Sequence, residues 1–200
     1  HRYFIDAPVN SDHITLSGSE AHHLIHVMRA DIGDRLILFD DSGNQFSAEI
    51  QQLKKNSADL LICERQAIDR ELPAQLTVAT ALPKGDRQKW LVEKLVELGT
   101  SSLIPLVTRR TVAKPVPQAL ARLERSVVES SKQCGRNQLM TIDPPLTVPE
   151  LIEQTSPDTF CIVAHPEPPA SGPSLDDQLA GPAASDIVLA IGPEGGWTDE

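Results

Sequence analysis

Cysteine, aromatic residues and long apolar runs are all scarce in this 200-residue chain. The three cysteines form no C-x-x-C pair, which excludes a zinc ribbon and a disulfide framework. Aromatic residues make up 4% of the chain, too few for a platform on which single-stranded bases stack. No apolar run approaches the roughly 18 residues of a membrane helix, and the first residues show no apolar segment typical of a secretion signal. We therefore predict a cytoplasmic protein that binds neither a membrane nor a metal ion.

Lysine and arginine are absent from residues 141–200, although the chain contains 18 of them. The net charge of −10 by itself argues against a nucleic-acid partner, because contacts to phosphate dominate such binding. The charges are segregated, however: the net charge is −4 over residues 1–70, +5 over 71–140 and −11 over 141–200. The middle third can therefore present a basic surface on an acidic protein, and a polyanionic partner is not excluded.

Short apolar runs with a period of two residues fill the first third of the chain, and this pattern predicts strands. One helix is predicted between them, with Ser19 as its N-cap and with Leu24, Val27 and Met28 on its buried face. The predicted strands cover residues 2–5, 13–16, 35–40, 45–53 and 57–64. We expect a compact, mostly β domain over residues 1–70.

After about residue 70, apolar runs alternate with helical patterns. A first helix is predicted to end at Gly99 and to bury Leu91, Leu95 and Leu98. Continuous apolar strands separated by helices indicate a parallel sheet that is covered on both faces. The predicted strands cover residues 76–82, 103–107, 159–164 and 187–191, and the helices cover 86–98 and 117–132. We therefore expect an α/β domain over residues 71–200.

The most informative segment follows the last predicted strand and has the sequence Ile191-Gly192-Pro193-Glu194-Gly195-Gly196. A glycine-rich loop after a buried strand is where open α/β sheets bind ligands, because backbone N–H groups can approach a ligand there. The segment matches neither the P-loop nor the dinucleotide-binding pattern, so a phosphate cradle is not predicted. A tight turn without a ligand remains an alternative, and a carboxylate such as Glu194 is more typical of a helix start than of a catalyst.

This loop is one of several motifs that occur in a recognisable order along essentially the whole chain. The others are Lys84-Gly85-Asp86 with residues 94–99, Pro105-Leu106 with Arg110 and Lys114, Gln133-Cys134-Gly135-Arg136, and His165-Pro166. In order and spacing they resemble the RsmE family of bacterial 16S rRNA (uracil-N3) methyltransferases, which belongs to the SPOUT superfamily. Arg2-Tyr3-Phe4 and residues 23–29 also resemble parts of that family's PUA-like RNA-binding domain.

The resemblance implies an N-terminal PUA-like β-barrel over residues 1–70 and a SPOUT α/β domain with a trefoil knot over residues 71–200. It also implies S-adenosylmethionine as the cofactor, 16S rRNA of the 30S subunit as the substrate, and a homodimer. In the family, a third knot motif would follow at a position beyond Glu200. We therefore expect this chain to be part of a longer protein and to lack the segment that closes the knot.

The resemblance also implies roles for individual residues. Arg110 and Arg136 are expected to be catalytic, because loss of the uracil N3 proton leaves negative charge that a fixed cation stabilises. The alternative is that both arginines only contact RNA phosphates or form ion pairs. Cofactor binding is expected of His165, Pro166, Ile191, Gly192, Pro193, Glu194, Gly195 and Gly196, and RNA contact of Arg2, His23, Arg29, Lys84 and Lys114. The general base is not predicted.

Other interpretations are less well supported by the residues. A non-catalytic rRNA-binding or ribosome-assembly factor is the alternative if the polypeptide ends at Glu200. A nucleotide-dependent metabolic enzyme of the doubly wound type lacks its dinucleotide fingerprint and the acidic ribose-binding residue that follows it. A metal site at His22 and His26, which share a helix face, lacks a carboxylate or cysteine at matching spacing. Cys134 is not expected to be a nucleophile, because N3 methylation needs no covalent adduct.

Overall fold

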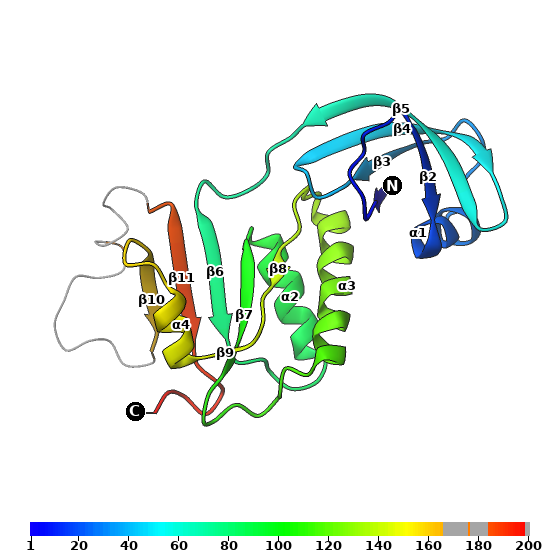
Figure 1. The fold of residues 1–200 in the computed structure, drawn as a ribbon. Coiled ribbons are helices and arrows are strands. Elements are labelled where there is room, and N and C mark those ends of the chain that lie inside the picture. Colours follow the sequence, from blue (N-terminus) through cyan, green and yellow to red (C-terminus); the bar gives the residue numbers. More distant parts are fainter. Residues whose placement is uncertain (166–175, 177–183, 199–200) are drawn as a thin grey trace. The chain divides into compact units, whose positions relative to one another are not determined.

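The computed structural model describes residues 1–165, 176 and 184–198 of the chain (Figure 1). The chain forms two compact units: the first comprises residues 1–71 and 128–139, and the second comprises residues 72–127 and 140–200. The division falls within helix α3 (Pro117–Cys134). Within the described ranges, no helix is long and apolar enough to cross a membrane. The domain boundary near residue 70 stays a prediction.

The first unit is built on a curled five-stranded sheet with the order β1-β3-β4-β5-β2 (Figure 1). Strands β1 and β3 are parallel, and the other neighbours are antiparallel. The strand bounds are β1 (Arg2–Phe4), β2 (His13–Ser17), β3 (Arg35–Phe39), β4 (Asn44–Leu53) and β5 (Ser57–Ala67). Alternate residues turn inward, so Ala48 and Ile50 of β4 pack in one core with Leu60 of β5. All five strands predicted for this region are confirmed, with ends that differ by at most three residues.

The predicted helix of the first unit is interrupted by a wider turn. Helix α1 (Gly18–His22) continues as a π-helical segment, η1 (His23–Val27), whose backbone hydrogen bonds span five residues instead of four. The change of period turns Val27 outward, and 58% of its surface is exposed. The prediction that Val27 lies on the buried face is therefore wrong. The predicted cap is also wrong, because Ser17 occupies the N-cap position and Ser19 lies inside the helix.

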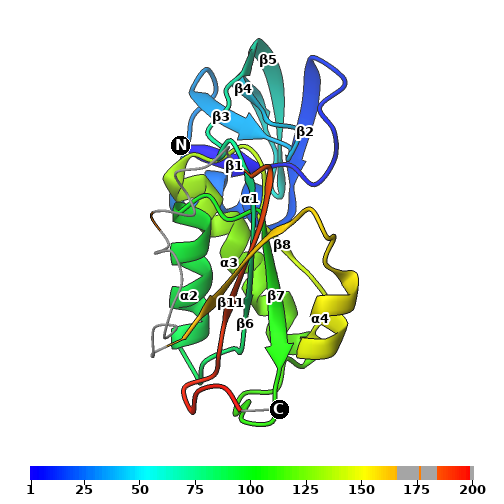
Figure 2. The same ribbon diagram turned by 90° about the vertical axis from the view of Figure 1, so that its left-hand side faces the viewer.

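The second unit contains a parallel sheet with the strand order β10-β11-β6-β7-β8, and a short strand, β9, pairs in parallel with the end of β7. Helices α2 (Arg87–Glu97) and α4 (Val148–Gln154) lie on opposite faces of this sheet (Figure 2). The strand bounds are β6 (Gln75–Thr80), β7 (Ser102–Val107), β8 (Thr141–Ile142), β9 (Leu146–Thr147), β10 (Phe160–Ala164) and β11 (Asp186–Ile191). The α/β fold class, with a β-rich N-terminal part and a parallel sheet after it, is confirmed.

Helix α2 buries a face that overlaps only in part with the predicted one, because Leu95 is buried as expected but Leu98 is not. Val92, Leu95 and Val96 are the buried residues, and they form a stripe at i, i+3 and i+4. Leu98 is 67% exposed, so its predicted place on the buried face is wrong. The helix ends as expected at Gly99, which has a φ of +85°.

Helix α4 is absent from the sequence prediction. It begins with a capping box in which the Thr147 hydroxyl accepts from the Glu150 N–H at 3.4 Å and the Glu150 carboxylate accepts from the Thr147 N–H at 2.7 Å. The hydrogen bonds from Thr147 hold the pKa of Glu150 below its ordinary value. Leu151 of this helix packs against Ala79 and Leu106, which are buried in the sheet.

Candidate functional site

The glycine loop, residues 192–196, leaves the carboxyl end of β11. Gly196 has a φ of +75°, and its N–H donates to the Pro193 carbonyl at 2.8 Å, which closes a tight turn. Pro193 is buried, whereas Glu194 and Gly195 are exposed. Because the strands of this sheet are parallel, the loop lies at the edge where open α/β sheets bind ligands.

Arg110 holds this loop from the segment that follows β7. Its Nη1 donates to the Gly195 carbonyl at 2.6 Å and to the Trp197 carbonyl at 3.0 Å. A Cβ built on Gly195 would lie 3.3 Å from Arg110 Cδ, so the arginine side chain packs closely on the loop backbone. Hydrogen bonds from a charged donor are stronger than those between neutral groups. Arg110 therefore fixes the carbonyls on both sides of Gly196.

Trp197 holds the same loop from the end of β10. Its indole N–H donates to the Ala164 carbonyl at 2.8 Å. The indole ring also lies against Gly192, where a Cβ would come within 2.9 Å of Trp197 Cε2. Gly192 has no positive φ, so the position requires glycine because of the ring and not because of its backbone conformation.

Glu194 makes a weaker contact to helix α2. Its Oε1 lies 3.2 Å from Arg87 Nη1, and the two side chains are 54% and 76% exposed. Exposed ion pairs of this kind contribute about 0–1 kcal/mol. The pair orients the Glu194 carboxylate but adds little to stability.

A cavity of about 230 Å³ adjoins the glycine loop. Its lining includes Arg109, Arg110, Thr147, Gly196 and Trp197. A second, mainly apolar cavity of about 500 Å³ runs between α4 and the sheet, and Trp197 lines it as well. Trp197 and Val148 therefore line both a cavity that contains Arg109 and Arg110 and an apolar one.

The other residues expected to act in the second unit lie near the same edge of the sheet. Lys84 follows β6, Lys114 follows β7, and His165 follows β10, and all three are exposed. Pro166 lies outside the described residues. The parallel topology thus brings the glycine loop, Arg110 and His165 to the carboxyl ends of neighbouring strands. In the described part of the chain, no group of three or more His, Cys, Asp or Glu residues is placed to hold a metal ion.

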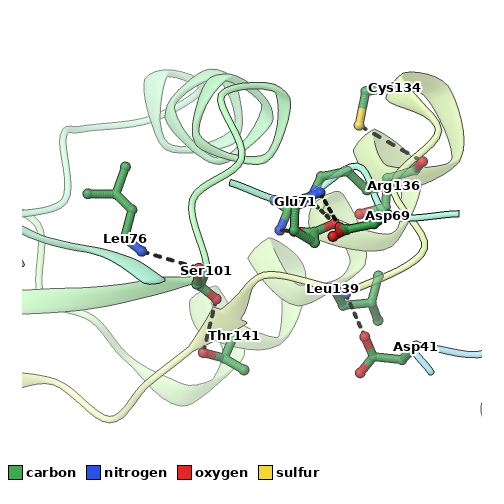
Figure 3. Close-up of polar contacts among 10 residues, drawn as sticks. Asp41, Asp69, Glu71, Leu76, Ser101, Cys134, Arg136, Leu139 and Thr141 are labelled. Carbon is green, nitrogen blue, oxygen red and sulfur yellow. Dashed lines mark hydrogen bonds and ion pairs between the residues drawn. The ribbon is translucent and has the colours of Figure 1, made fainter. Parts of the chain in front are cut away.

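Arg136 lies in the first unit and is buried, with 4% of its surface exposed. Its Nε and Nη2 donate to the two carboxylate oxygens of Glu71, and the Nε–Oε1 distance is 3.2 Å (Figure 3). Arg2 Nη2 donates to the Arg136 carbonyl at 3.1 Å and to Asn137 Oδ1 at 2.7 Å. Burial and the nearby charge of Arg70 lower the pKa of Arg2 from its ordinary value. The expected catalytic residue Arg136 and the expected RNA contact Arg2 thus share one polar network.

Comparison with known families identifies this architecture. The RNA methyltransferase domain family matches residues 70–200, and the RNA methyltransferase PUA domain family matches residues 16–63. This chain belongs to the RNA methyltransferase family. The resemblance to the RsmE family is also confirmed, because relatives of this chain carry the name ribosomal RNA small subunit methyltransferase E.

Two of these relatives and one solved structure show how far the similarity extends. The Synechocystis protein is 36% identical over 189 residues, which cover 93% of this chain and 61% of the relative's length. The Bacillus subtilis protein is 29% identical, over 99% of this chain and 82% of its own length. The ribosomal RNA small subunit methyltransferase E of Neisseria gonorrhoeae, solved bound to S-adenosylmethionine, has a TM-score of 0.87 and 26% identity over 99% of this chain and 81% of that one. This chain therefore spans less than two thirds of the Synechocystis relative.

The region that matches the methyltransferase PUA family contains two of the expected RNA contacts, His23 and Arg29. The His23 ring lies 5.8 Å from the Tyr3 ring, and its buried Nδ1 has no hydrogen-bond partner among the described residues. Arg29 is exposed and has a φ of +53°, a backbone conformation that residues other than glycine rarely adopt. His23 is therefore partly built into the core, whereas Arg29 is presented to solvent.

Sequence patterns do not predict the ion pair between Lys132 and Glu20 in the first unit of this chain. Lys132 Nζ lies 2.9 Å from Glu20 Oε1, and the side chains are 11% and 16% exposed. Burial alone would lower the pKa of Lys132, but its hydrogen bonds and ion pairs with Glu20 and Glu129 outweigh burial, and the pKa is raised. The partners are 112 residues apart, so no local pattern could have identified them.

Proposed function

We propose that the protein transfers a methyl group from S-adenosylmethionine to N3 of a specific uridine in 16S rRNA of the 30S subunit, as a cytoplasmic homodimer. The observation that carries this proposal is the glycine loop at the carboxyl end of β11, clamped by Arg110, in a chain of the RNA methyltransferase family. The Neisseria gonorrhoeae structure, which holds S-adenosylmethionine, matches nearly the whole of this chain and supports the same cofactor here.

The glycine loop fits such a cofactor by its open backbone. Within the described residues, the N–H groups of the exposed Glu194 and Gly195 donate to no protein acceptor, so they are available to a ligand. His165 and residues 191–196 would hold the cofactor at this edge of the sheet. S-adenosylmethionine, when bound, supplies a methyl group activated by a sulfonium centre.

The work left to the protein is orientation and charge stabilisation. Loss of the N3 proton to a base leaves negative charge that is shared with the flanking uracil carbonyl oxygens. The bound cofactor would then supply the methyl group to N3 and keep the electron pair of the broken C–S bond on its sulfur. A fixed cation aimed at those oxygens lowers the barrier. Arg110 is our candidate, because it is exposed beside the glycine loop and lines the cavity there. Its Nη1 donates to two loop carbonyls, whereas its Nε and Nη2 bond to no other described residue and can face a substrate. A catalytic role for Arg136 also remains a prediction. Its Nε and Nη2 donate to Glu71, so these two nitrogens would have to leave the carboxylate before they could contact a substrate.

The same proposal assigns RNA binding to basic residues of both units. Lys84 and Lys114 in the second unit, and Arg2, His23 and Arg29 in the first, are proposed to contact the RNA. Contacts to phosphate and sugar position an RNA without reading its sequence. The middle third, with its net charge of +5, is the segment that contains Lys84 and Lys114.

The proposal is tested with the protein expressed from its complete reading frame, 30S subunits that lack the modification, and S-adenosylmethionine. We expect 3-methyluridine in the nucleosides of digested 16S rRNA, detected by mass spectrometry, and cofactor binding in calorimetry. Absence of both results would reject the proposal. Binding of small-subunit rRNA without methyl transfer would instead favour the non-catalytic assembly factor.

A further inference from the structure

We propose that Arg110 and Trp197 are positioning residues that clamp the glycine loop between the ends of β7 and β10, and that cofactor affinity depends on this clamp. The inference rests on the proposed function for its ligand, but the clamp itself is a property of the chain. Its elements are the two bonds from Arg110 Nη1 and the single bond from the Trp197 indole.

The clamp holds the loop from both sides of β11. In the strand order β10-β11-β6-β7, β10 is the neighbour of β11 on one side, and β7 lies beyond β6 on the other. Ala164, the acceptor for Trp197, ends β10, whereas Arg110 follows β7. Residues 192–197 are thus hydrogen-bonded both to the end of β10 and to the segment after β7, which lie on opposite sides of β11.

Arg110 acts on the one residue of the loop that needs an unusual conformation. Its two acceptors, the carbonyls of Gly195 and Trp197, flank Gly196, which has a φ of +75°. Without the guanidinium, these carbonyls would bond to water and the turn would exchange among other conformations. A loop that is already ordered loses less entropy when it binds a ligand, so the clamp raises affinity without touching the ligand.

Trp197 secures the loop independently of Arg110. Its ring packs against the core formed by Ala79, Leu106 and Leu151, and its edge fills the space that a side chain at position 192 would need. Loss of Arg110 therefore frees residues 195–197 from one side, while the packing of Trp197 keeps the fold intact.

The test uses Trp197 as its own reporter. These 200 residues contain two tryptophans, and Trp90 on α2 is 61% exposed and distant in sequence from the loop, so Trp90→Phe leaves Trp197 as the single tryptophan among them. In this background we expect Arg110→Ala to increase acrylamide quenching of Trp197 at least about twofold, and Arg110→Lys to give a smaller increase. Arg122→Ala is the matched control, because Arg122 is an exposed arginine of α3 whose side chain donates to the Gln118 carbonyl of its own helix. Quenching that is equal in Arg110→Ala and Arg122→Ala overturns the clamp.

Calorimetry with S-adenosylmethionine measures the consequence for binding. We expect Arg110→Ala to raise Kd about tenfold, in addition to the loss of turnover at saturating cofactor that its proposed catalytic role predicts, with a melting temperature close to that of the parent. Arg122→Ala should leave Kd unchanged. An unchanged Kd in Arg110→Ala, or a loss confined to turnover, overturns the positioning role. If the parent protein binds no cofactor, the proposed function fails, whereas the quenching measurement still decides whether the clamp exists.

Discussion

Arg29 is a residue whose backbone conformation is unfavourable for its side chain. Its φ of +53° places it in the left-handed region, which costs a non-glycine residue about 1 kcal/mol. We predict that Arg29→Gly raises the free energy of unfolding by about 0.5 kcal/mol, because relief of strain outweighs the added entropy of the unfolded chain. If Arg29 contacts RNA as proposed, the same substitution weakens binding to small-subunit rRNA.

Urea denaturation and RNA titration measure the two effects of Arg29→Gly. Arg35→Ala is the matched control, because Arg35 is an exposed arginine of the same unit that pairs with Glu49 at 3.7 Å. A stabilised protein with unchanged RNA affinity would show that the strained arginine has no role in RNA binding.

Arg136 is a residue whose removal tests structure and catalysis together. Arg136→Ala leaves the Glu71 carboxylate, whose side chain is 15% exposed, without its bidentate partner. Breaking a buried pair in this way costs about 3–5 kcal/mol, whereas removing both charges costs less. We therefore predict that Arg136→Ala is markedly less stable in urea than the double variant Arg136→Ala/Glu71→Ala.

The same double variant separates the two roles proposed for Arg136. If Arg136 stabilises the transition state, the folded double variant should lose turnover while it keeps its affinity for the cofactor. Full turnover in the double variant would leave the ion pair with Glu71 as the only function of this arginine.

The conformation of the glycine loop depends on the close packing of the Trp197 ring against Gly192. Gly192→Ala should be destabilising by about 1–3 kcal/mol, because its Cβ would lie 2.9 Å from Trp197 Cε2. In a Trp197→Leu background the smaller side chain leaves room for that Cβ. We predict a double-mutant cycle in which the two substitutions couple by at least about 1 kcal/mol, measured by urea unfolding. Strictly additive effects would show that the ring is not what demands glycine at position 192.

The elements differ in how much of them the sequence could predict. Strands such as β4 and β5 were predictable because their apolar and polar residues alternate along the chain. The capping box of Thr147 and Glu150 is a sequence signal for α4, which is too short to show a helical period. The outward turn of Val27 was not predictable, because a π-helical segment changes the period on which the helical pattern depends. The prediction for Leu98 was wrong for another reason, because the buried face of α2 depends on how this helix packs against the sheet.

The site shows the same division. The motif and the alternation of strands and helices correctly predicted a glycine loop after a parallel strand, whereas ligand binding at that loop stays a prediction. Arg110 and its acceptor Gly195 are 85 residues apart in the sequence, and Arg136 and its partner Glu71 are 65 residues apart. Such contacts depend on tertiary structure, so sequence alone marked these arginines as important without showing what they bind.

At the scale of the whole molecule, stability should decline in alkaline solution because of two groups in the first unit. Burial, with the nearby charge of Glu20, raises the pKa of Tyr3 from its ordinary 10.0 to about 12. The pKa of Lys132 is also raised, from an ordinary 10.5. Both groups hold their protons more tightly in the folded state. Their contribution is therefore complete below about pH 10 and is lost as the pH rises through the folded-state values.

We predict that the free energy of unfolding falls by about 1–2 kcal/mol between pH 9 and pH 11, measured by urea titration at each pH. Tyr3→Phe removes the phenol, whose hydroxyl has no hydrogen-bond partner among the described residues, so this variant should fold and show a shallower decline. Lys132→Met should remove the other part of the slope, but at a lower stability at pH 7, because Glu20 loses its partner. A decline as steep in Tyr3→Phe as in the parent would mean that groups elsewhere in the molecule titrate with unfolding.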